Sequence, residues 1–239
     1  MNLPNVQMFW PGGALSAVER LAMRSFLAHG HGVELYSYDD GLEVPAGVRR
    51  RAAAEVLPKP EGTAIGVADL FRFTLLVERG GLFCDPDVVC LKPWRFAADM
   101  PQFFAAERTP DKPLKGGKVP AKVGSCAVKL PPESDIARRA LERCRSIGPA
   151  QIGWGFAGPI LLTELVQKHR RQDDVLHPDV ICPVDYWNFH HLFTGMVMIP
   201  DNCHGVHFWS ELWRRNFFDR NGRYDPLSLV ERLKAAYPE

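Results

Sequence analysis

The amino-acid sequence predicts a single α/β domain built on a parallel sheet and extending over all 239 residues. In the first 40 residues a short apolar strand at 6–10, a helix that begins near residue 16 and a second strand at 33–38 follow one another. A stronger helical pattern at 65–79 ends at two glycines and is followed by another apolar strand. Strands that alternate with helices in this way are typical of parallel βαβ units.

Local signals predict the individual elements in order. Pro11-Gly12-Gly13 ends the first strand, and Ser16 with Glu19 three residues later has the spacing of a helix capping box. Gly80-Gly81 ends the helix at 65–79. Further strands are expected at 82–84, 88–91, 103–106 and 123–130, and further helices at 134–146, 159–170 and 226–236. The segment 110–122, rich in Lys, Gly and Pro, is expected to be a mobile loop.

The composition excludes several classes of protein. Hydrophobic residues make up 46% and charged residues 24%, which is ordinary for a soluble globular chain. The 29 basic and 28 acidic residues leave a net charge of +1, which argues against a broad binding surface for nucleic acid or anionic membrane. Six cysteines without a CxxC pair favour a reducing compartment. No signal peptide and no apolar run long enough to span a bilayer are evident, so a cytoplasmic location is expected.

Two charged residues share the apolar stripe of the helix at 65–79. At about 100° per residue, Asp69 and Arg72 fall within about 60° of each other. Ile65 and Leu76 lie on the same stripe, and charges on such a face need partners because burying them unpaired is costly. The pair is therefore either a structural ion pair or a pair of groups that point at a polar ligand.

Two carboxylates follow the next strand. Asp85 and Asp87 stand two residues apart in an extended segment, so their side chains project to the same side. Pro86 between them marks the point where the strand leaves the sheet. Ligands of open α/β sheets bind at the carboxyl ends of strands, and carboxylate oxygens suit Mg²⁺ or Mn²⁺. An isolated Asp-Pro-Asp is more typical of a turn, but its position after the charged helix favours a metal site.

The region from Ala64 to Trp94 resembles the DXD sugar-binding region of glycosyltransferase family 32. The three-residue step from Asp69 to Arg72, the sixteen-residue step from Asp69 to Asp85 and the intervening Gly-Gly match that pattern. The catalytic domains of clostridial glucosylating toxins are similar to it as well. Looser similarities follow along the chain, at Trp10 before Gly12-Gly13, at Gly158-Pro159, and at HFWSELW over 207–213.

The resemblance implies a type-A glycosyltransferase fold, with a Rossmann-like, mixed but mostly parallel sheet flanked by helices. Residues 1–100 would form the nucleotide-sugar-binding half, and residues 101–239 the acceptor-binding and closing half. The implied activity is metal-dependent, retaining hexosyl transfer with Mn²⁺ or Mg²⁺ as cofactor. The donor would be a UDP-hexose and the acceptor a saccharide or glycan, as in polysaccharide biosynthesis.

The resemblance also implies roles for individual residues. Asp85, Asp87 and His207 would hold the cation, and Asp85, Asp87 and Arg72 would form the catalytic set. Donor-binding residues would be Asp69 and Arg72 on the sugar, Asp85 on sugar or ribose hydroxyls, Trp10 on the uracil, and Trp209 or Trp213 over the β-phosphate. Glu211-Leu212 replaces the family's Asn-Ser, so the assignment of the closing residues is less specific. Residues 201–216 are expected to be a closing segment, the alternative being a strand or helix packed permanently on the core.

Other functions compete with this interpretation. A nucleotidyltransferase of similar fold usually carries a basic Gly-rich loop after the first strand, whereas Pro11 to Leu15 contain no Lys or Arg. A catalytically silent carbohydrate- or nucleotide-binding protein would be expected to have lost part of the charged set. The G-x-G-x-x-G at 153–158 is not preceded by a strand signal, so a loop lining the pocket is expected there and not a dinucleotide site. His190 and His191 are expected to be ordinary surface or core residues.

Overall fold

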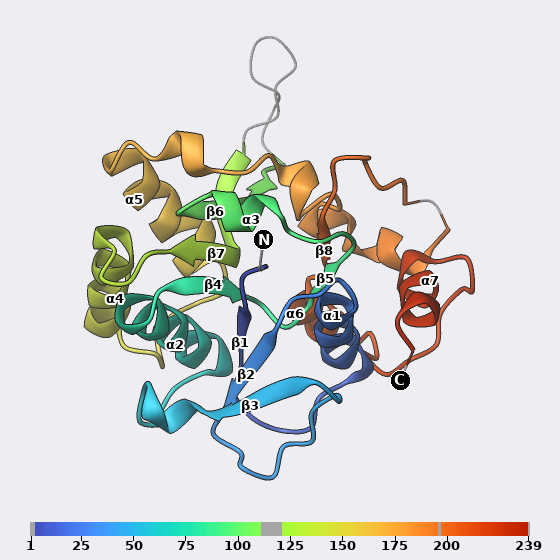
Figure 1. The fold of residues 1–239 in the computed structure, drawn as a ribbon, viewed down its shortest axis with the longest axis horizontal. Coiled ribbons are helices and arrows are strands. Elements are labelled where there is room, and N and C mark those ends of the chain that lie inside the picture. The colour runs from blue at the N-terminus through green and yellow to red at the C-terminus, as the bar shows by residue number, and fades with distance from the viewer. Residues whose placement is uncertain (1–2, 111–120, 196, 239) are drawn as a thin grey trace.

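A mixed six-stranded sheet runs through the centre of the protein (Figure 1). The computed structural model describes residues 3–110, 121–195 and 197–238. The strand order is β3-β2-β1-β4-β7-β6. The strands are β1 (Val6–Trp10), β2 (Val33–Ser37), β3 (Val48–Ala52), β4 (Gly81–Cys84), β6 (Phe103–Arg108) and β7 (Ala121–Leu130). Strands β3, β2, β1 and β4 are parallel, and β7 pairs antiparallel with both β4 and β6, which confirms the predicted mixed, mostly parallel α/β sheet.

Helices cover both faces of this sheet. In Figure 1, α2 (Ala64–Glu78), α4 (Asp135–Ile147) and α5 (Thr163–Lys168) lie to the left of the sheet, and α1 (Ala17–Ala28) and α7 (Leu229–Ala236) lie to the right. Successive strand residues serve opposite faces: Phe9 and Phe83 pack in the core beside α2 and α4, whereas Met8 and Leu82 pack in the core on the side of α1. This period of two is the pattern that a sheet buried on both sides requires.

The predicted local signals determine where the helices begin and end. The Glu19 carboxylate accepts a hydrogen bond from the Ser16 backbone N–H at 2.7 Å, and the Ser16 hydroxyl accepts one from Val18 N–H, so the capping box is formed. Helix α2 starts after Thr63, whose hydroxyl accepts a hydrogen bond from Gly66 N–H at 3.1 Å. It stops before Gly80 and Gly81, which have φ values of +61° and +94°, a region that glycine adopts without steric cost.

A small second sheet joins the C-terminal part of the chain to the segment after β4. Strand β5 (Val88–Cys90) pairs antiparallel with β8 (Gly205–His207), with Val88 opposite His207. The extended segment predicted at 88–91 therefore exists, but it belongs to this second sheet. The other helices are α3 (Phe96–Asp99), α6 (Ser210–Arg215) and the shorter helical segments Ala53–Glu55, Phe156–Leu162, Gln172–Asp174, Pro178–Val180 and Tyr186–Phe193.

Several predicted boundaries change. The helix expected at 159–170 is divided into a wide turn over Phe156–Leu162, which accommodates Pro159, and α5. The helix expected at 226–236 begins only at Leu229, with the Ser228 hydroxyl accepting from Glu231 N–H. Strand β3 was not predicted. In the loop expected at 110–122, residues 111–120 lie outside the described part of the chain.

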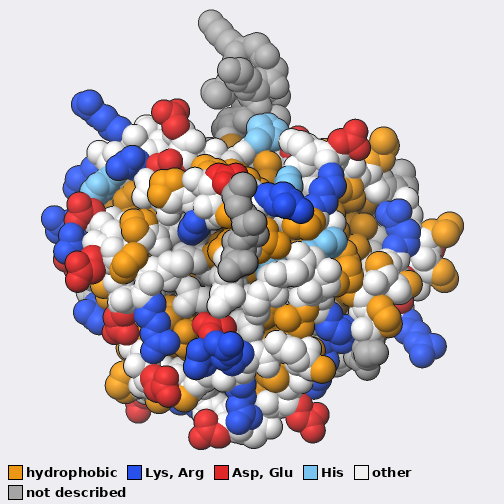
Figure 2. Space-filling view, in the orientation of Figure 1, with side chains coloured by type: hydrophobic (Ala, Val, Ile, Leu, Met, Phe, Trp, Pro, Cys, Tyr) orange, Lys and Arg blue, Asp and Glu red, His pale blue; other side chains and the backbone are white. Residues whose placement is uncertain are grey.

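The surface agrees with the near-zero net charge. Figure 2 shows basic and acidic side chains interspersed on the face in view, with no large area of a single sign. None of the helices in the described ranges combines the length and the apolar character that crossing a bilayer would require.

Candidate active site

A cavity of about 610 Å³ opens beside the carboxyl ends of the parallel strands β1 and β4. Its wall includes residues 9–12 after β1, residues 85–87 after β4, and the N-terminal half of α2. The ends of β6 and β7 and the segments 154–159 and 207–212 contribute further. This is where open α/β sheets bind ligands, because the chain leaves the sheet in loops at that edge.

One part of the cavity floor is organised around Arg72. Its guanidinium donates hydrogen bonds to Asp69, one helical turn earlier, and through Nη2 to Oδ1 of Asp85 at 2.8 Å. It also lies over the Phe83 ring, 5.0 Å from the centroid. The two residues of α2 therefore form the ion pair that their spacing allowed, and the same arginine connects that pair to the carboxylate after β4.

Burial and pairing act in opposite directions on these charges. Asp69 and Arg72 are both buried. Burial raises the pKa of Asp69 to about 6, although the neighbouring Arg72 opposes the shift. For Arg72, burial disfavours the cation, but Asp85 and Asp69 more than offset this and raise its pKa. Arg72 thus remains a permanent buried cation between two carboxylates.

The other part of the floor pairs Asp87 with His207. Oδ1 of Asp87 lies 3.3 Å from Nε2 of His207, and Oδ2 accepts a hydrogen bond from the Ser210 backbone N–H at 2.8 Å. Burial disfavours both ions, but their mutual attraction is larger, so the pKa of Asp87 is lowered and that of His207 is raised well above its ordinary value. The pairing of β5 with β8 brings together these two residues, which are 120 positions apart in the chain.

Asp85, Asp87 and His207 converge as a possible metal site. One donor atom from each lies within 4.8 Å of the other two. Two ligands that each lie about 2.1 Å from one octahedral ion are themselves about 3 Å apart, and the 3.3 Å between Asp87 and His207 is close to that value. Two carboxylates and an imidazole are donors that Mn²⁺ accepts. The residues present therefore fit a divalent cation.

The three tryptophans proposed to bind a donor occupy different environments. Trp10 is partly exposed at the cavity, where its Nε1 donates to the Gly13 carbonyl at 2.7 Å and the Arg220 guanidinium lies over its ring. Trp209 borders the cavity but is only 5% exposed, and its ring centroid is 3.9 Å from that of His207. Trp213 is 0% exposed, lies in the core beside Phe208 and does not border the cavity. The prediction that Trp213 contacts a donor is therefore wrong.

The segment expected to close over the site is packed into the protein. Within 201–216, β8 is paired with β5, and Phe208 and Trp213 are completely buried. The Trp209 Nε1 donates to the Val184 carbonyl at 2.9 Å, and the Phe208 N–H donates to the Asp87 carbonyl at 2.9 Å. Residues 205–213 thus have the packed arrangement of the alternative, a strand and helix on the core. Closure of 201–216 on binding of donor and metal stays a prediction.

The structure adds two residues that the sequence interpretation missed. Glu107, at the end of β6, borders the cavity and is 9% exposed; burial raises its pKa to about 7, although His207 and Lys122 oppose the shift. Arg220 also borders the cavity and pairs with Glu19 at 2.9 Å. The acid that follows four apolar residues in the strand FFAAER was a usable signal for Glu107, whereas nothing local distinguishes Arg220 from its neighbours.

The glycine-rich segment 153–158 contributes to the cavity wall, as predicted. Helix α4 ends at Ile147 and a turn follows, so no strand leads into this segment. Trp154, Gly155 and Gly158 border the cavity. Gly158 lies so close to β7 that an added Cβ would be 2.7 Å from the Ser125 nitrogen, which explains why a residue without a side chain stands there.

Comparisons with known proteins give distant similarities. No protein-family model matches the chain, and no curated protein matches its sequence. A structure described as "PaToxG Glycosyltransferase" is 13% identical with a TM-score of 0.49, over 70% of this chain and 69% of that chain. The glycosyltransferase GlyE of Streptococcus pneumoniae TIGR4 is 12% identical with a TM-score of 0.48, over 99% of this chain. The alignment spans 65% of the GlyE chain. At this distance, functional inference depends on the residues of the cavity.

Proposed function

We propose that this protein is a metal-dependent glycosyltransferase that moves a hexosyl group from a UDP-hexose to a saccharide or glycan acceptor with retention of configuration. The observation that carries the proposal is the convergence of Asp85, Asp87 and His207, next to the buried Asp69–Arg72 pair, in a cavity at the carboxyl edge of the sheet. These residues come from separate parts of the chain, and the resemblance to family 32 proposes the same set. Residues 1–100 supply most of the donor side.

In this proposal three of the charged residues bind the cation, and Arg72 positions one of them. Departure of a nucleoside diphosphate builds negative charge on its phosphates, and a bound Mn²⁺ or Mg²⁺ supplies a Lewis acid at that position. Asp85, Asp87 and His207 hold that ion. Arg72 fixes one oxygen of Asp85 through the 2.8 Å hydrogen bond, leaving the other oxygen for the ion or a sugar hydroxyl.

The donor's base and sugar have separate partners. Trp10, with its ring partly exposed at the cavity, would stack on the uracil, and Arg220 beside it would favour the negative charge of the diphosphate. Asp69 lies on the cavity side of α2, where a hydroxyl of the sugar would reach it. Trp209 would form a fixed wall beside the β-phosphate, since it is already packed in place. A hexosyl group and a diphosphate need several polar contacts in one cavity, and these residues supply them.

Product analysis separates the proposal from its two rivals. Purified protein is incubated with UDP-hexoses and Mn²⁺, with saccharide acceptors present or absent. Released UDP supports a glycosyltransferase, released pyrophosphate supports a nucleotidyltransferase, and binding without either product supports a catalytically silent protein. The anomeric configuration of the new linkage, read by NMR, tests retention directly.

The metal assignment is tested by thermal stability. A ligand present at about 100 times its Kd stabilises a folded protein by about 2.7 kcal/mol, so UDP should raise the melting temperature more when Mn²⁺ is present. In Asp87→Asn and in Asp85→Asn, the extra Mn²⁺-dependent part should disappear while the ligand-free protein still melts cooperatively. Asp135→Asn, at an exposed aspartate paired with Arg138, is the matched control. An unchanged Mn²⁺ effect in both site variants would contradict the assignment.

A further inference from the structure

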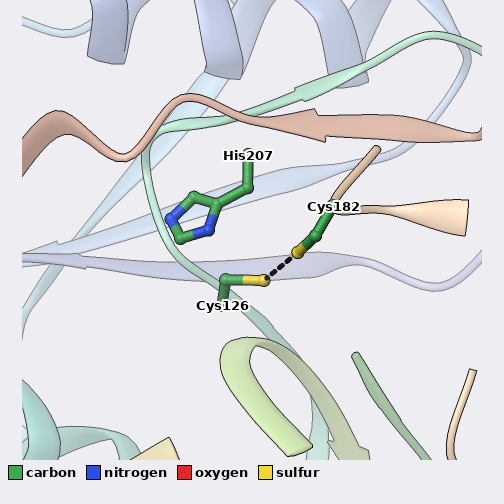
Figure 3. A group of neighbouring side chains, drawn as sticks. All are labelled: Cys126, Cys182 and His207. Atoms are coloured by element: carbon green, nitrogen blue, oxygen red, sulfur yellow. Dashed lines mark hydrogen bonds between the residues drawn. The ribbon is translucent and has the colours of Figure 1, made fainter. Parts of the chain in front are cut away.

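A second group of donor atoms lies directly beside the proposed cation site. Cys126 of β7, Cys182 after the helical segment Pro178–Val180, and His207 of β8 come together from three distant parts of the chain (Figure 3). The two sulfur atoms are 3.6 Å apart, and one donor atom of each residue lies within 4.8 Å of the other two. The three side chains are at least nine-tenths buried, with exposures of 3% for Cys126, 1% for Cys182 and 8% for His207.

The orientation of His207 distinguishes its two nitrogens. Nε2 faces Asp87 at 3.3 Å. Nδ1 is buried and has no hydrogen-bond partner among the described residues, and in Figure 3 this nitrogen points toward the Cys126 sulfur. A buried polar atom without a partner is costly, and such groups in native proteins usually have a bound ion or water to explain them. The unpartnered nitrogen is aimed at the space that it shares with the two sulfurs.

We propose that Cys126, Cys182 and Nδ1 of His207 form a binding site for a thiophilic divalent cation such as Zn²⁺ or Cd²⁺. Zinc–sulfur bonds are about 2.3 Å long, so two sulfurs on one tetrahedral ion are about 3.8 Å apart. The 3.6 Å separation of the two sulfurs is near this value without any rearrangement of the backbone. Zinc sites often have three protein ligands and one water, and Cys126 borders the cavity, from which an ion and a water can arrive.

The new site and the Asp85–Asp87 site prefer different ions. Two sulfurs and an imidazole favour soft or borderline ions, whereas two carboxylates and an imidazole favour Mn²⁺ or Mg²⁺. The sites share His207, whose neutral ring has one lone pair available, because the other nitrogen then carries the proton. A cation on Nδ1 leaves a proton on Nε2, which then donates to Asp87. The Asp85–Asp87 site would thereby lose its nitrogen ligand, so a thiophilic ion should inhibit any activity that needs Mn²⁺.

Cobalt is the probe for the new site, and its readout does not depend on catalysis. The protein is stripped of metal, kept reduced with a thiol-free reductant, and titrated with Co²⁺. Thiolate ligation gives a sulfur-to-cobalt charge-transfer band, and tetrahedral geometry gives intense visible bands. We expect one equivalent of Co²⁺ to produce both bands and one equivalent of Zn²⁺ to abolish them.

Variants locate the ligands. The bands should disappear in Cys126→Ala/Cys182→Ala and persist in Cys144→Ala, which removes another buried cysteine, in α4, outside the cluster. His207→Gln should weaken Co²⁺ binding by more than about tenfold, because even residues that only support metal ligands have effects of that size. Circular dichroism and thermal melting check that each variant is folded. Ligation by one sulfur only, or bands that survive in the double cysteine variant, would overturn the proposal, as would their absence from the wild-type protein.

The inhibition rests on the proposed function and is measured separately. Zn²⁺ should reduce Mn²⁺-dependent UDP release in the wild-type protein and should have little effect in Cys126→Ala/Cys182→Ala. If the protein releases no UDP under any condition, the proposed function fails while the cobalt spectra still test the site. If UDP is released and Zn²⁺ inhibits the wild-type protein and the double variant equally, the ion acts elsewhere and the shared-histidine argument is wrong.

Discussion

The two parts of the cavity floor stabilise their buried carboxylates with different cations. On the Arg72 side, Asp69 and Asp85 face a guanidinium that is hydrogen-bonded to both. On the His207 side, Asp87 faces an imidazole at 3.3 Å. Both sides bury carboxylates next to a cation, but the guanidinium keeps its proton under all ordinary conditions, whereas an imidazole can exchange its proton for a metal ion. The first side therefore holds a permanent cation, Arg72, whereas the proton of His207 on the second side can be replaced by a metal ion.

The two sides also differ in how the chain builds them. Asp69 and Arg72 are one turn apart on α2, and Asp85 follows the strand that comes directly after that helix. The His207 side needs β5 to pair with β8 and brings in Cys126 and Cys182 from two further segments. Residues close together in the sequence therefore position the permanent cation Arg72. Residues far apart in the sequence position His207 and the sulfur atoms that could bind a metal ion. Each of the following predictions tests part of this contrast.

The largest effect is expected from removing the permanent cation. Arg72→Met leaves Asp69 and Asp85 without their buried partner, and loss of one member of a buried pair typically costs about 3–5 kcal/mol. The free energy of unfolding, measured with urea, should fall by about that amount. Arg138→Met, which removes an exposed partner of Asp135, should cost far less, because solvent screens such surface pairs. Similar losses in the two variants would show that the Arg72 pair has no special structural role.

The second prediction concerns Glu107, close to the His207 side. Its pKa in the folded protein is raised to about 7, so the folded state holds a proton that the unfolded chain has already lost. The contribution of Glu107 to the free energy of unfolding should therefore fall as pH rises from about 4.5 to 7, by at most about 3.5 kcal/mol at about 1.4 kcal/mol per pH unit. In Glu107→Gln the part of the decrease that comes from Glu107 should be absent, so the variant should lose less stability than wild type between about pH 4.5 and 7, while Asp69, whose pKa is also raised, still contributes. Glu142→Gln, at an exposed site on α4, should keep the wild-type pH profile.

The third prediction concerns the donor's base. Stacking of a base on an aromatic ring is worth about 1–3 kcal/mol, so Trp10→Ala should weaken UDP binding by roughly tenfold or more in calorimetric titrations. Trp187→Ala is the matched control, because Trp187 is also partly buried but does not border the cavity. If Trp10→Ala lowers stability and leaves UDP affinity unchanged, Trp10 is a packing residue and the proposed position of the base is wrong.

The smallest change is expected in hydrogen exchange of residues 205–213. Because β8 and the residues after it are already paired and buried, their amides should be protected in the free protein. Adding UDP and Mn²⁺ should increase that protection only slightly. A large gain that requires both ligands would support the closing segment predicted from the sequence, and it would show that the His207 side is assembled only when a donor binds.

Local sequence signals were sufficient to predict the positions of the residues on the Arg72 side of the cavity floor. The apolar period of α2, the Gly80-Gly81 stop and the short apolar run of β4 predicted where Asp69, Arg72 and Asp85 would lie, because each depends on neighbours within about 20 residues. The edge strand β3 was not predicted from the sequence, because its residues, VRRRA, lack an apolar face. Arg49 and Arg51 instead pair with Glu34 on β2, a contact that exists only once the sheet has formed.

Tertiary structure alone determined the positions of the two tryptophans near the C-terminus and the groups that surround His207. Trp209 and Trp213 stand four residues apart, a spacing that would place them on one face of a helix. Trp209, however, has a left-handed backbone with φ of +56°, and α6 begins only after it, so its ring stays at the cavity while Trp213 enters the core. The meeting of His207 with Asp87, Cys126 and Cys182 depends on strand pairing between segments about 120 residues apart. Such pairing is set by the burial of whole elements against one another, which no window of local sequence contains.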